Sequence, residues 1–191
     1  MATATPPDAP STSLWIPLAL FASTIGVVGS LYLSIALDLK ACPLCFYQRA
    51  FMMAAAMILF FGMALRGVPY AVLTPLALGS TVAGGGIAAF HVYLDGKGIL
   101  ECPIGATGFL VAPQESFVVY VFLLAFLLCD LFQERRFVPQ GLGAILIGGV
   151  FAYACLHPAV TPPSPNPTAP YPTDKKLDGC RKVFRAPGAN P

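Results

Sequence analysis

Two cysteines separated by two residues are the part of this sequence whose spacing most clearly indicates chemistry. Cys42 and Cys45 flank Pro43 and Leu44, and Arg49 follows one helical turn later. Side chains at these spacings lie on one face of a helix, and proline suits the first position of a helix. The unpaired N–H groups and positive dipole of a helix start, together with the arginine, would favour a thiolate. We interpret the pair as a redox-active dithiol.

Other interpretations of the dithiol are a structural disulfide or two inert thiols. A single pair of cysteines is too little for a closed zinc site, which needs four ligands. Since no histidine follows Cys45, attachment of a c-type haem is excluded. We therefore predict neither a metal nor a haem. His91 either forms a hydrogen bond or exchanges a proton with a bound electron acceptor, or only forms an interfacial hydrogen bond to the backbone.

The composition indicates a membrane protein. Of the 191 residues, 57% are hydrophobic and 10% are charged, and the mean hydropathy is +0.73. Soluble domains contain about 25% charged residues, and a spanning helix needs about 20 mainly apolar residues. We predict an all-α polytopic membrane protein, a four-helix transmembrane bundle with a fifth C-terminal helix. The apolar segments are 13–37, 45–65, 68–93, 116–132 and the shorter, glycine-rich 141–157. A net charge of +2 gives no indication of a nucleic-acid partner.

The sequence divides into four parts. Residues 1–12 have the composition of a disordered leader, and residues 158–191 that of an extended, proline-rich tail. Between them we expect a membrane domain at 13–133 and the fifth helix at 139–157. Within the membrane domain, the two loops on the cysteine side are 38–44 and 94–115.

The distribution of basic residues orients the protein in the membrane. Arg66, Arg135 and Arg136 lie in the short loops of one side, whereas Lys40 and Lys97 lie in those of the other. Positive residues in short loops favour the cytoplasmic side. The basic residues of the tail lie too far from the last span for this rule to apply. We therefore expect the cysteine loops to be external.

The residues 42–49, Cys-Pro-Leu-Cys-Phe-Tyr-Gln-Arg, at the start of a second span resemble the bacterial disulfide bond formation protein B (DsbB) family. His91 at the end of the third span and the cysteine-containing loop after it add to the resemblance, which covers roughly residues 14–133. It implies a protein of the bacterial inner membrane with its cysteine loops on the periplasmic side. It also implies an oxidoreductase that reoxidises a periplasmic thioredoxin-fold, DsbA-like protein and passes the electrons to ubiquinone or menaquinone.

The resemblance also implies a role for each residue of the motif. Cys45 would be the thiolate that faces the quinone, and Cys42 its exchange partner. Arg49 would hold the quinone with help from His91. Cys102 would exchange with the partner protein.

The sequence departs from the family in the number of cysteines in its second external loop. The family normally has two there, whereas residues 94–115 contain only Cys102. If the fifth apolar segment spans the membrane, Cys180 reaches the external side and can complete the second pair. Cys155 is the alternative, and Cys129 is expected to be an inert thiol near the opposite face. The catalytic set that we predict is Cys42, Cys45, Cys102 and Cys180.

Two other functions are compatible with the sequence. One is a non-enzymatic assembly or accessory subunit that keeps the scaffold, which the missing loop cysteine favours. The other is a reductase of the vitamin K epoxide reductase type, which also uses a C-x-x-C pair beside a quinone. The position of the pair at the start of the second span, followed by Gln48 and Arg49, favours the DsbB family.

Overall fold

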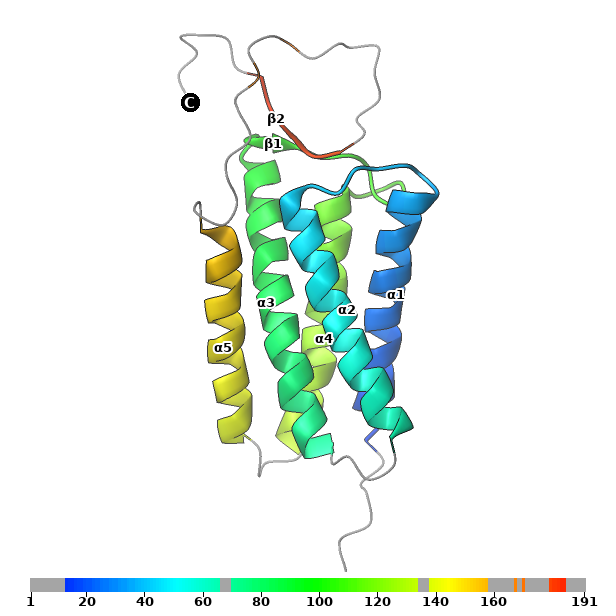
Figure 1. Cartoon of the computed structure of the whole chain (residues 1–191), viewed down its shortest axis with the longest axis vertical. Helices are drawn as coiled ribbons and strands as arrows, with labels where there is room; N and C mark the ends of the chain where they lie inside the picture. Colours follow the sequence, from blue (N-terminus) through cyan, green and yellow to red (C-terminus); the bar gives the residue numbers. More distant parts are fainter. Residues whose placement is uncertain are drawn as a thin grey trace, which may run out of the picture.

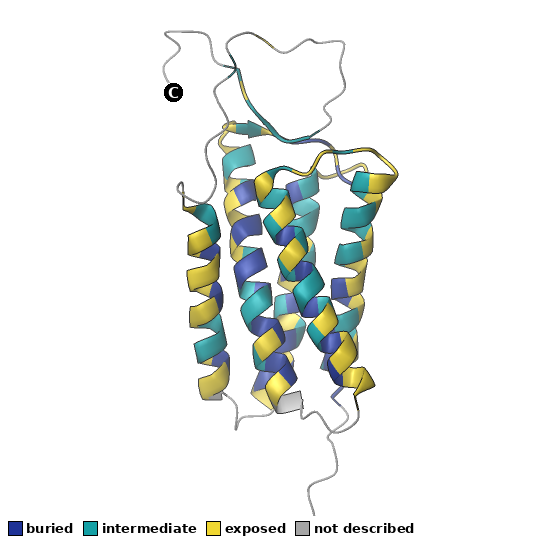
Figure 2. Ribbon diagram, in the orientation of Figure 1, coloured by how far each residue is buried: buried dark blue, intermediate teal, exposed yellow. Residues whose placement is uncertain are grey.

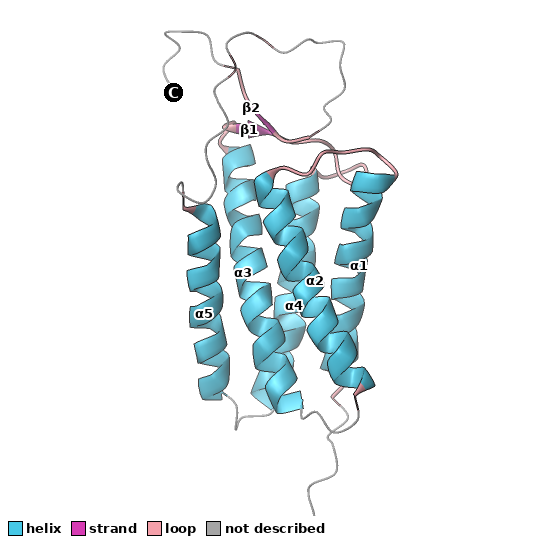
Figure 3. Cartoon of the chain, in the orientation of Figure 1, coloured by secondary structure: helices cyan, strands magenta, loops and turns pink. Residues whose placement is uncertain are grey.

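The computed structural model describes residues 13–65, 70–133, 138–157, 167, 170 and 179–184. The expected leader 1–12 and most of the tail lie outside these residues. The elements are α1 (Trp15–Ile35), α2 (Pro43–Ala64), α3 (Tyr70–Gly96), β1 (Leu100–Glu101), α4 (Ala112–Gln133), α5 (Val138–Leu156) and β2 (Arg181–Lys182). All five helices run along the long axis of the molecule (Figures 1 and 3).

The prediction of an all-α, multi-pass membrane protein is confirmed. Within the described residues, five helices are long and apolar enough to cross a membrane. Several helices extend beyond the apolar segments that were predicted from the sequence. In particular, α3 continues to Gly96 and α4 already begins at Ala112, so the loop between them is shorter than the expected 94–115.

Helices α1 to α4 form a bundle around one apolar core, and α5 packs on the outside of α3 (Figure 1). Many residues on the outer faces of the helices are exposed (Figure 2). A large share of them are apolar, as expected of a surface that meets lipid. The buried core consists of Ile16, Ala19, Met52, Ala55, Leu59, Ala77, Leu78, Ala88, Tyr120, Leu123, Leu127 and Leu131.

Glycines let α3 approach its neighbours closely on two sides, as their small size suggested. A Cβ at Gly84 would overlap the Tyr120 hydroxyl of α4, which instead donates a hydrogen bond of 2.6 Å to the carbonyl oxygen of Gln48. On the other side, a Cβ at Gly148 of α5 would overlap the carbonyl oxygen of Gly79. The position of α5 therefore depends on small residues at its contact with α3.

A buried carboxylate links α4 to α3 and to the residues before α1, at the end of the bundle opposite the dithiol. Asp130 of α4 accepts hydrogen bonds from Ser13 and from Thr74 of α3, and only 2% of its surface is exposed. The hydroxyls satisfy a carboxylate that would otherwise be costly to bury. This end is held by polar contacts and contains no cysteine pair among the described residues.

Candidate functional site: two cysteine pairs beside a cavity

The first cysteine pair forms at the start of α2. Cys42 is the N-cap residue, with φ −69° and ψ 164°, and Pro43 is the first helical residue. The Cys42 sulfur accepts a hydrogen bond from the Cys45 backbone N–H at 3.2 Å, and the two sulfurs lie 3.0 Å apart, within hydrogen-bonding distance. Both cysteines are reduced. The predicted helix-start geometry is therefore present.

The hydrogen bonds at the helix start favour a thiolate on Cys42. The Cys45 thiol lowers the pKa of Cys42 to about 7, burial opposes this, and the backbone N–H groups of Cys45 and Leu44 lower it further. The resemblance to the DsbB family implied a thiolate on Cys45. In the reduced pair, however, the sulfur of Cys42 caps the helix and accepts the backbone hydrogen bond. The role of Cys45 beside a quinone stays a prediction.

The second pair is a disulfide between Cys102 and Cys180, which are 78 residues apart. Cys102 follows β1 and Cys180 precedes β2, and these short strands pair antiparallel, with Leu100 opposite Lys182. Residues 179–184 are thereby held across the loop between α3 and α4 (Figure 1). Cys180, the partner that the sequence analysis preferred to Cys155, thus completes the pair, while Cys155 and Cys129 are unpaired.

Contacts on either side of Cys180 hold the described part of the tail in place. Gly179 forms a bridge to Lys40, in the loop between α1 and α2, and a Cβ at this glycine would lie 2.7 Å from the Lys40 carbonyl oxygen. Arg181 forms an ion pair of 3.2 Å with Glu101. Cys180 is therefore placed by two loops that are distant in sequence.

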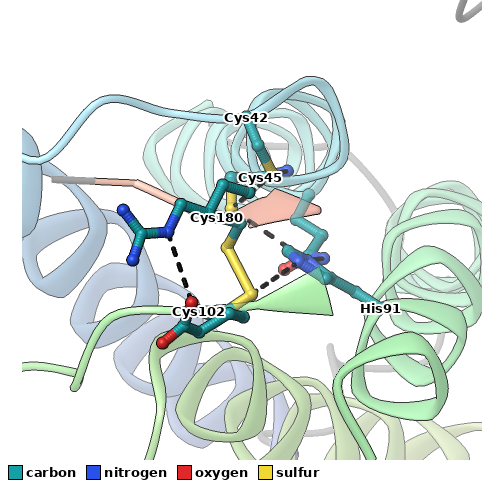
Figure 4. Close-up of a disulfide and its surroundings, with 8 residues drawn as sticks. Cys42, Cys45, His91, Cys102 and Cys180 are labelled. Carbon is teal, nitrogen blue, oxygen red and sulfur yellow. Dashed lines mark hydrogen bonds and ion pairs between the residues drawn. A yellow bond between two sulfur atoms is a disulfide. The ribbon is translucent and has the colours of Figure 1, made fainter. Parts of the chain in front are cut away.

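His91, near the end of α3 that faces the cysteines, lies beside the two pairs and contacts both (Figure 4). Its ring is fully buried. Nε2 lies 3.3 Å from the Cys102 sulfur, and Nδ1 lies 4.0 Å from the Cys45 sulfur. The Gln48 side-chain nitrogen, 3.1 Å from Nδ1, can donate to that atom, which leaves the ring proton on Nε2 to point at Cys102.

A cavity of about 320 Å³ lies next to the pairs, between α1, α2, α4 and the two loops above them. Cys45 and Cys180 are among its lining residues, and most of the remaining lining is apolar. Its size falls within the range of about 300–1,000 Å³ found for small-molecule sites. His91 is not among the lining residues, so its contacts are with sulfur and Gln48, and its expected role at the quinone stays a prediction.

Arg49 reaches from α2 across this cavity to α1. Its guanidinium donates hydrogen bonds to the Ser30 hydroxyl at 2.7 Å, to the Ser30 carbonyl oxygen at 3.0 Å, and to the Ser34 hydroxyl. These contacts satisfy an arginine that would be costly in an apolar span. Neither serine was predicted as a partner of Arg49 from the sequence, although polar residues four positions apart in the first span are a usable signal.

Glu115, in the first turn of α4, organises the loop that covers the cavity. Its carboxylate accepts hydrogen bonds from the backbone N–H groups of Ala106 at 2.7 Å and Thr107 at 2.8 Å, and from the Thr107 hydroxyl. All three residues also line the cavity. Glu115 was not predicted from the sequence, because nothing local in the sequence links it to positions 106 and 107.

Comparisons with known proteins agree with this arrangement. The family model "Disulfide bond formation protein DsbB" matches residues 11–118. The chain belongs to the DsbB family. Two curated relatives, both named "Disulfide bond formation protein B 1", come from Pseudomonas fluorescens strains Pf-5 and Pf0-1. Each is 35% identical to this chain, over 79 and 77 residues respectively. No solved structure matches.

The match to DsbB covers only part of the site. Each alignment spans 40% of this chain and 46% of the relative, so the chain spans about half the length of these DsbB relatives. The family segment 11–118 includes Cys42, Cys45, Arg49, His91 and Cys102. Helix α5 and Cys180 lie beyond it, although Cys180 supplies one sulfur of the second pair.

Proposed function

We propose that this protein is a thiol:quinone oxidoreductase that reoxidises a periplasmic thioredoxin-fold, DsbA-like dithiol and passes the electrons to ubiquinone or menaquinone. One observation carries the proposal. A reduced pair and a disulfide lie side by side, and each contributes a sulfur-bearing residue, Cys45 and Cys180, to the lining of one cavity. Such an arrangement suits electron transfer from one pair to the other and on to a molecule in the cavity.

The second pair is the entry point for electrons from the partner. A thiolate of the partner attacks the Cys102–Cys180 disulfide and forms a mixed disulfide with one of these cysteines, while the other leaves as a thiolate. The second thiol of the partner then resolves the mixed disulfide. The partner loses two electrons and two protons, and Cys102 and Cys180 become two thiols. Cys102 is buried and Cys180 is half-buried, and both lie outside the spanning helices, so Cys180 is the sulfur that a thiolate of the partner reaches more easily.

Electrons then pass to the first pair by a second exchange. The sulfurs of Cys180, Cys42 and Cys45 lie within 4.8 Å of one another, which is close enough for direct attack after small side-chain movements. When Cys42 and Cys45 form a disulfide, the Cys180 thiolate can attack it. Cys102 then re-forms its bond to Cys180 and releases the first pair as a dithiol. The Nε2–H group of His91 points at Cys102 and stabilises negative charge on that sulfur by hydrogen bonding.

The residues around the cavity fit a quinone. A quinone, when bound, supplies an acceptor for two electrons and two protons. The apolar walls suit a flat ring and an isoprenoid chain, and Arg49 provides hydrogen-bond donors at the depth of Cys45. Ser30 and Ser34 hold this arginine in place. The fixed cation also favours a thiolate on Cys45 once Cys42 is engaged in a disulfide.

The accessory-subunit alternative was favoured by the single cysteine of the loop. Because Cys180 provides a partner for Cys102, this argument for a scaffold without a complete relay no longer holds. Basic residues in the short loops on the opposite side support a periplasmic location for the cysteine loops.

The test is dithiol-dependent quinone reduction by the purified protein, with a reduced thioredoxin-fold protein as the electron donor. Replacing Cys45→Ser removes one of the two sulfurs that must give electrons to the quinone, so activity is expected to fall to the uncatalysed rate. Cys129→Ser is the matched control and should retain full activity. Undiminished turnover in the Cys45→Ser variant would refute the mechanism.

A further inference from the structure

Three of the four paired cysteines and His91 also form a cluster of possible metal ligands. One ligand atom from each of Cys42, Cys45, His91 and Cys180 lies within 4.8 Å of the other three. The sequence offered only the first two as neighbours, which is too few for a closed site. The fold adds an imidazole from α3 and a sulfur from the tail (Figure 4). We propose that this cluster binds one Zn²⁺ ion when both cysteine pairs are reduced.

The donor set is suited to zinc. Three cysteines and one histidine are a common set for tetrahedral zinc sites, and thiolates select zinc over magnesium or calcium. With Zn–S distances of about 2.3 Å, neighbouring donor atoms of a tetrahedron lie about 3.8 Å apart. The cluster spans up to 4.8 Å, so side-chain shifts of about 1 Å would close it.

The surroundings favour a metal-thiolate complex at this position. Zn²⁺ with three thiolates carries one net negative charge. The start of α2 directs its positive dipole end toward Cys42 and Cys45, and the guanidinium of Arg49 lines the cavity that Cys45 also lines. His91 would bind zinc through Nδ1, which lies 4.0 Å from the Cys45 sulfur and gives up its contact with Gln48. Its Nε2–H, 3.3 Å from the Cys102 sulfur, is then the kind of outer contact that holds a ligating imidazole in orientation.

The site depends on the redox state because Cys180 forms a disulfide with Cys102 in the oxidised protein. A dithiol that reduces this bond becomes a disulfide itself, and Cys102 and Cys180 each take up one electron and one proton. Zinc then displaces the protons of Cys42, Cys45 and Cys180 into the buffer, as metal binding to thiols requires. Re-forming either disulfide removes at least one ligand, so the ion must leave before the protein is oxidised.

The consequence for activity rests on the proposed function. An enzyme that has received electrons from its partner but has no quinone to oxidise it carries four thiols. Zinc would bind this form and keep it out of the cycle. Inhibition by zinc should therefore be strongest when reduced partner is in excess over quinone, and should be reversed by a chelator.

The direct test is zinc binding to the full-length protein in detergent, without quinone or partner, measured by competition with a colorimetric chelator. Protein reduced by a thiol-free phosphine under argon should bind one Zn²⁺ per chain, and oxidised protein should bind at least about 100-fold more weakly. Because no turnover is measured, this result is independent of whether the proposed function is correct. Equal zinc affinity of the reduced and oxidised forms would overturn the proposal.

A matched pair of variants identifies the ligands. Cys180→Ser and Cys102→Ser both prevent the disulfide, but only the first removes a proposed ligand. After reduction, Cys180→Ser should bind zinc about 100-fold more weakly than Cys102→Ser, and the double variant Cys129→Ser, Cys155→Ser should bind like the unaltered protein. Equal affinities of the two single variants would refute the assignment, as would a Co²⁺-loaded protein without thiolate-to-cobalt absorption.

Discussion

The two cysteine pairs differ in how much of the molecule each one requires. Cys42 and Cys45 are placed by a single helix start, and their contacts arise within four residues. Cys102 and Cys180 are brought together across 78 residues by a loop, a two-stranded sheet and a returning tail. The first pair is therefore a local feature that any chain with this motif can form, whereas the second depends on the topology of the whole protein.

Helix α5 is the element that makes the second pair possible. Helices α2 and α4 both begin on the side of the cysteine loops, so the chain is on the opposite side of the membrane when α4 ends. The fifth span brings residue 180 back to the side of Cys102. This explains how a family member can keep one cysteine in its second loop and take the other from its C-terminal tail.

The largest effect should come from separating the two pairs with Cys180→Ser. Cys42 and Cys45 remain intact, but the Cys102–Cys180 disulfide, which we propose accepts electrons from the protein partner, can no longer form. Quinone reduction driven by a thioredoxin-fold dithiol should fall by about 1,000-fold, since one partner of a thiol–disulfide exchange is missing. Quinone reduction driven by dithiothreitol, which is small enough to reach the first pair directly, should change by less than about threefold.

The outcome with the two donors decides whether the pairs act in series. If quinone reduction by the Cys180→Ser variant fell equally with the protein donor and with dithiothreitol, the two pairs would not act in series, because Cys180 would then be needed at the quinone step. Unchanged activity with the protein donor would mean that the partner reduces Cys42 and Cys45 directly. Alkylation of Cys42 in the variant provides the control that the start of α2 is still folded.

The difference between the pairs also explains what the sequence could predict. Residue spacing was sufficient for the first pair, the position of Arg49 and the five spans, because these follow from helical periodicity and hydropathy. It was not sufficient for the partners of Arg49 on α1 or for the link from Glu115 to the loop, which depend on how separate elements meet. Cys180 could be suggested only by counting cysteines and spans.

For His91, too, the sequence predicted the position along the helix but not the contacts of the side chain. Its place at the outer end of the third span was readable from the sequence, but the direction of its ring was not. The ring lies between Cys45 and Cys102, away from the lining of the cavity. Side-chain direction on a buried helix depends on neighbours such as Gln48, which no pattern along α3 encodes.

A smaller effect on activity is expected from replacing Arg49, which lines the cavity together with Cys45. Arg49→Gln removes the cation and its hydrogen bonds to Ser30 and Ser34. Charge-assisted hydrogen bonds are worth about 1.5–3 kcal/mol, so the KM for quinone should rise by about tenfold or more. Exchange between the partner and the Cys102–Cys180 disulfide, followed without quinone, should keep its rate. A slowed exchange would indicate that Arg49 supports both pairs.

The packing of α5 tests how far the second pair depends on a distant contact. Gly148→Leu would force a side chain against Gly79 and Val82 of α3, at a cost of about 1–3 kcal/mol for overpacking. The fraction of protein with the Cys102–Cys180 bond, counted by mass spectrometry without reduction, should fall. Gly149→Leu is the matched control, since a Cβ there meets nothing within 4 Å. Equal bonding in both variants would mean that the tail finds Cys102 without help from α5.

The smallest effect should come from the loop that covers the cavity, where both pairs border the same space. Glu115→Gln keeps the shape of the side chain but weakens its hydrogen bonds to the Ala106 and Thr107 N–H groups. Loss of the charge at these bonds should cost about 0.5–1.5 kcal/mol. The loop lies over the cavity and is joined to Cys102 through Pro103, so the KM for quinone should rise a few-fold while the disulfide stays formed. A larger loss with the protein donor than with dithiothreitol would instead assign Glu115 to the second pair, because its loop would then position Cys102 for the partner.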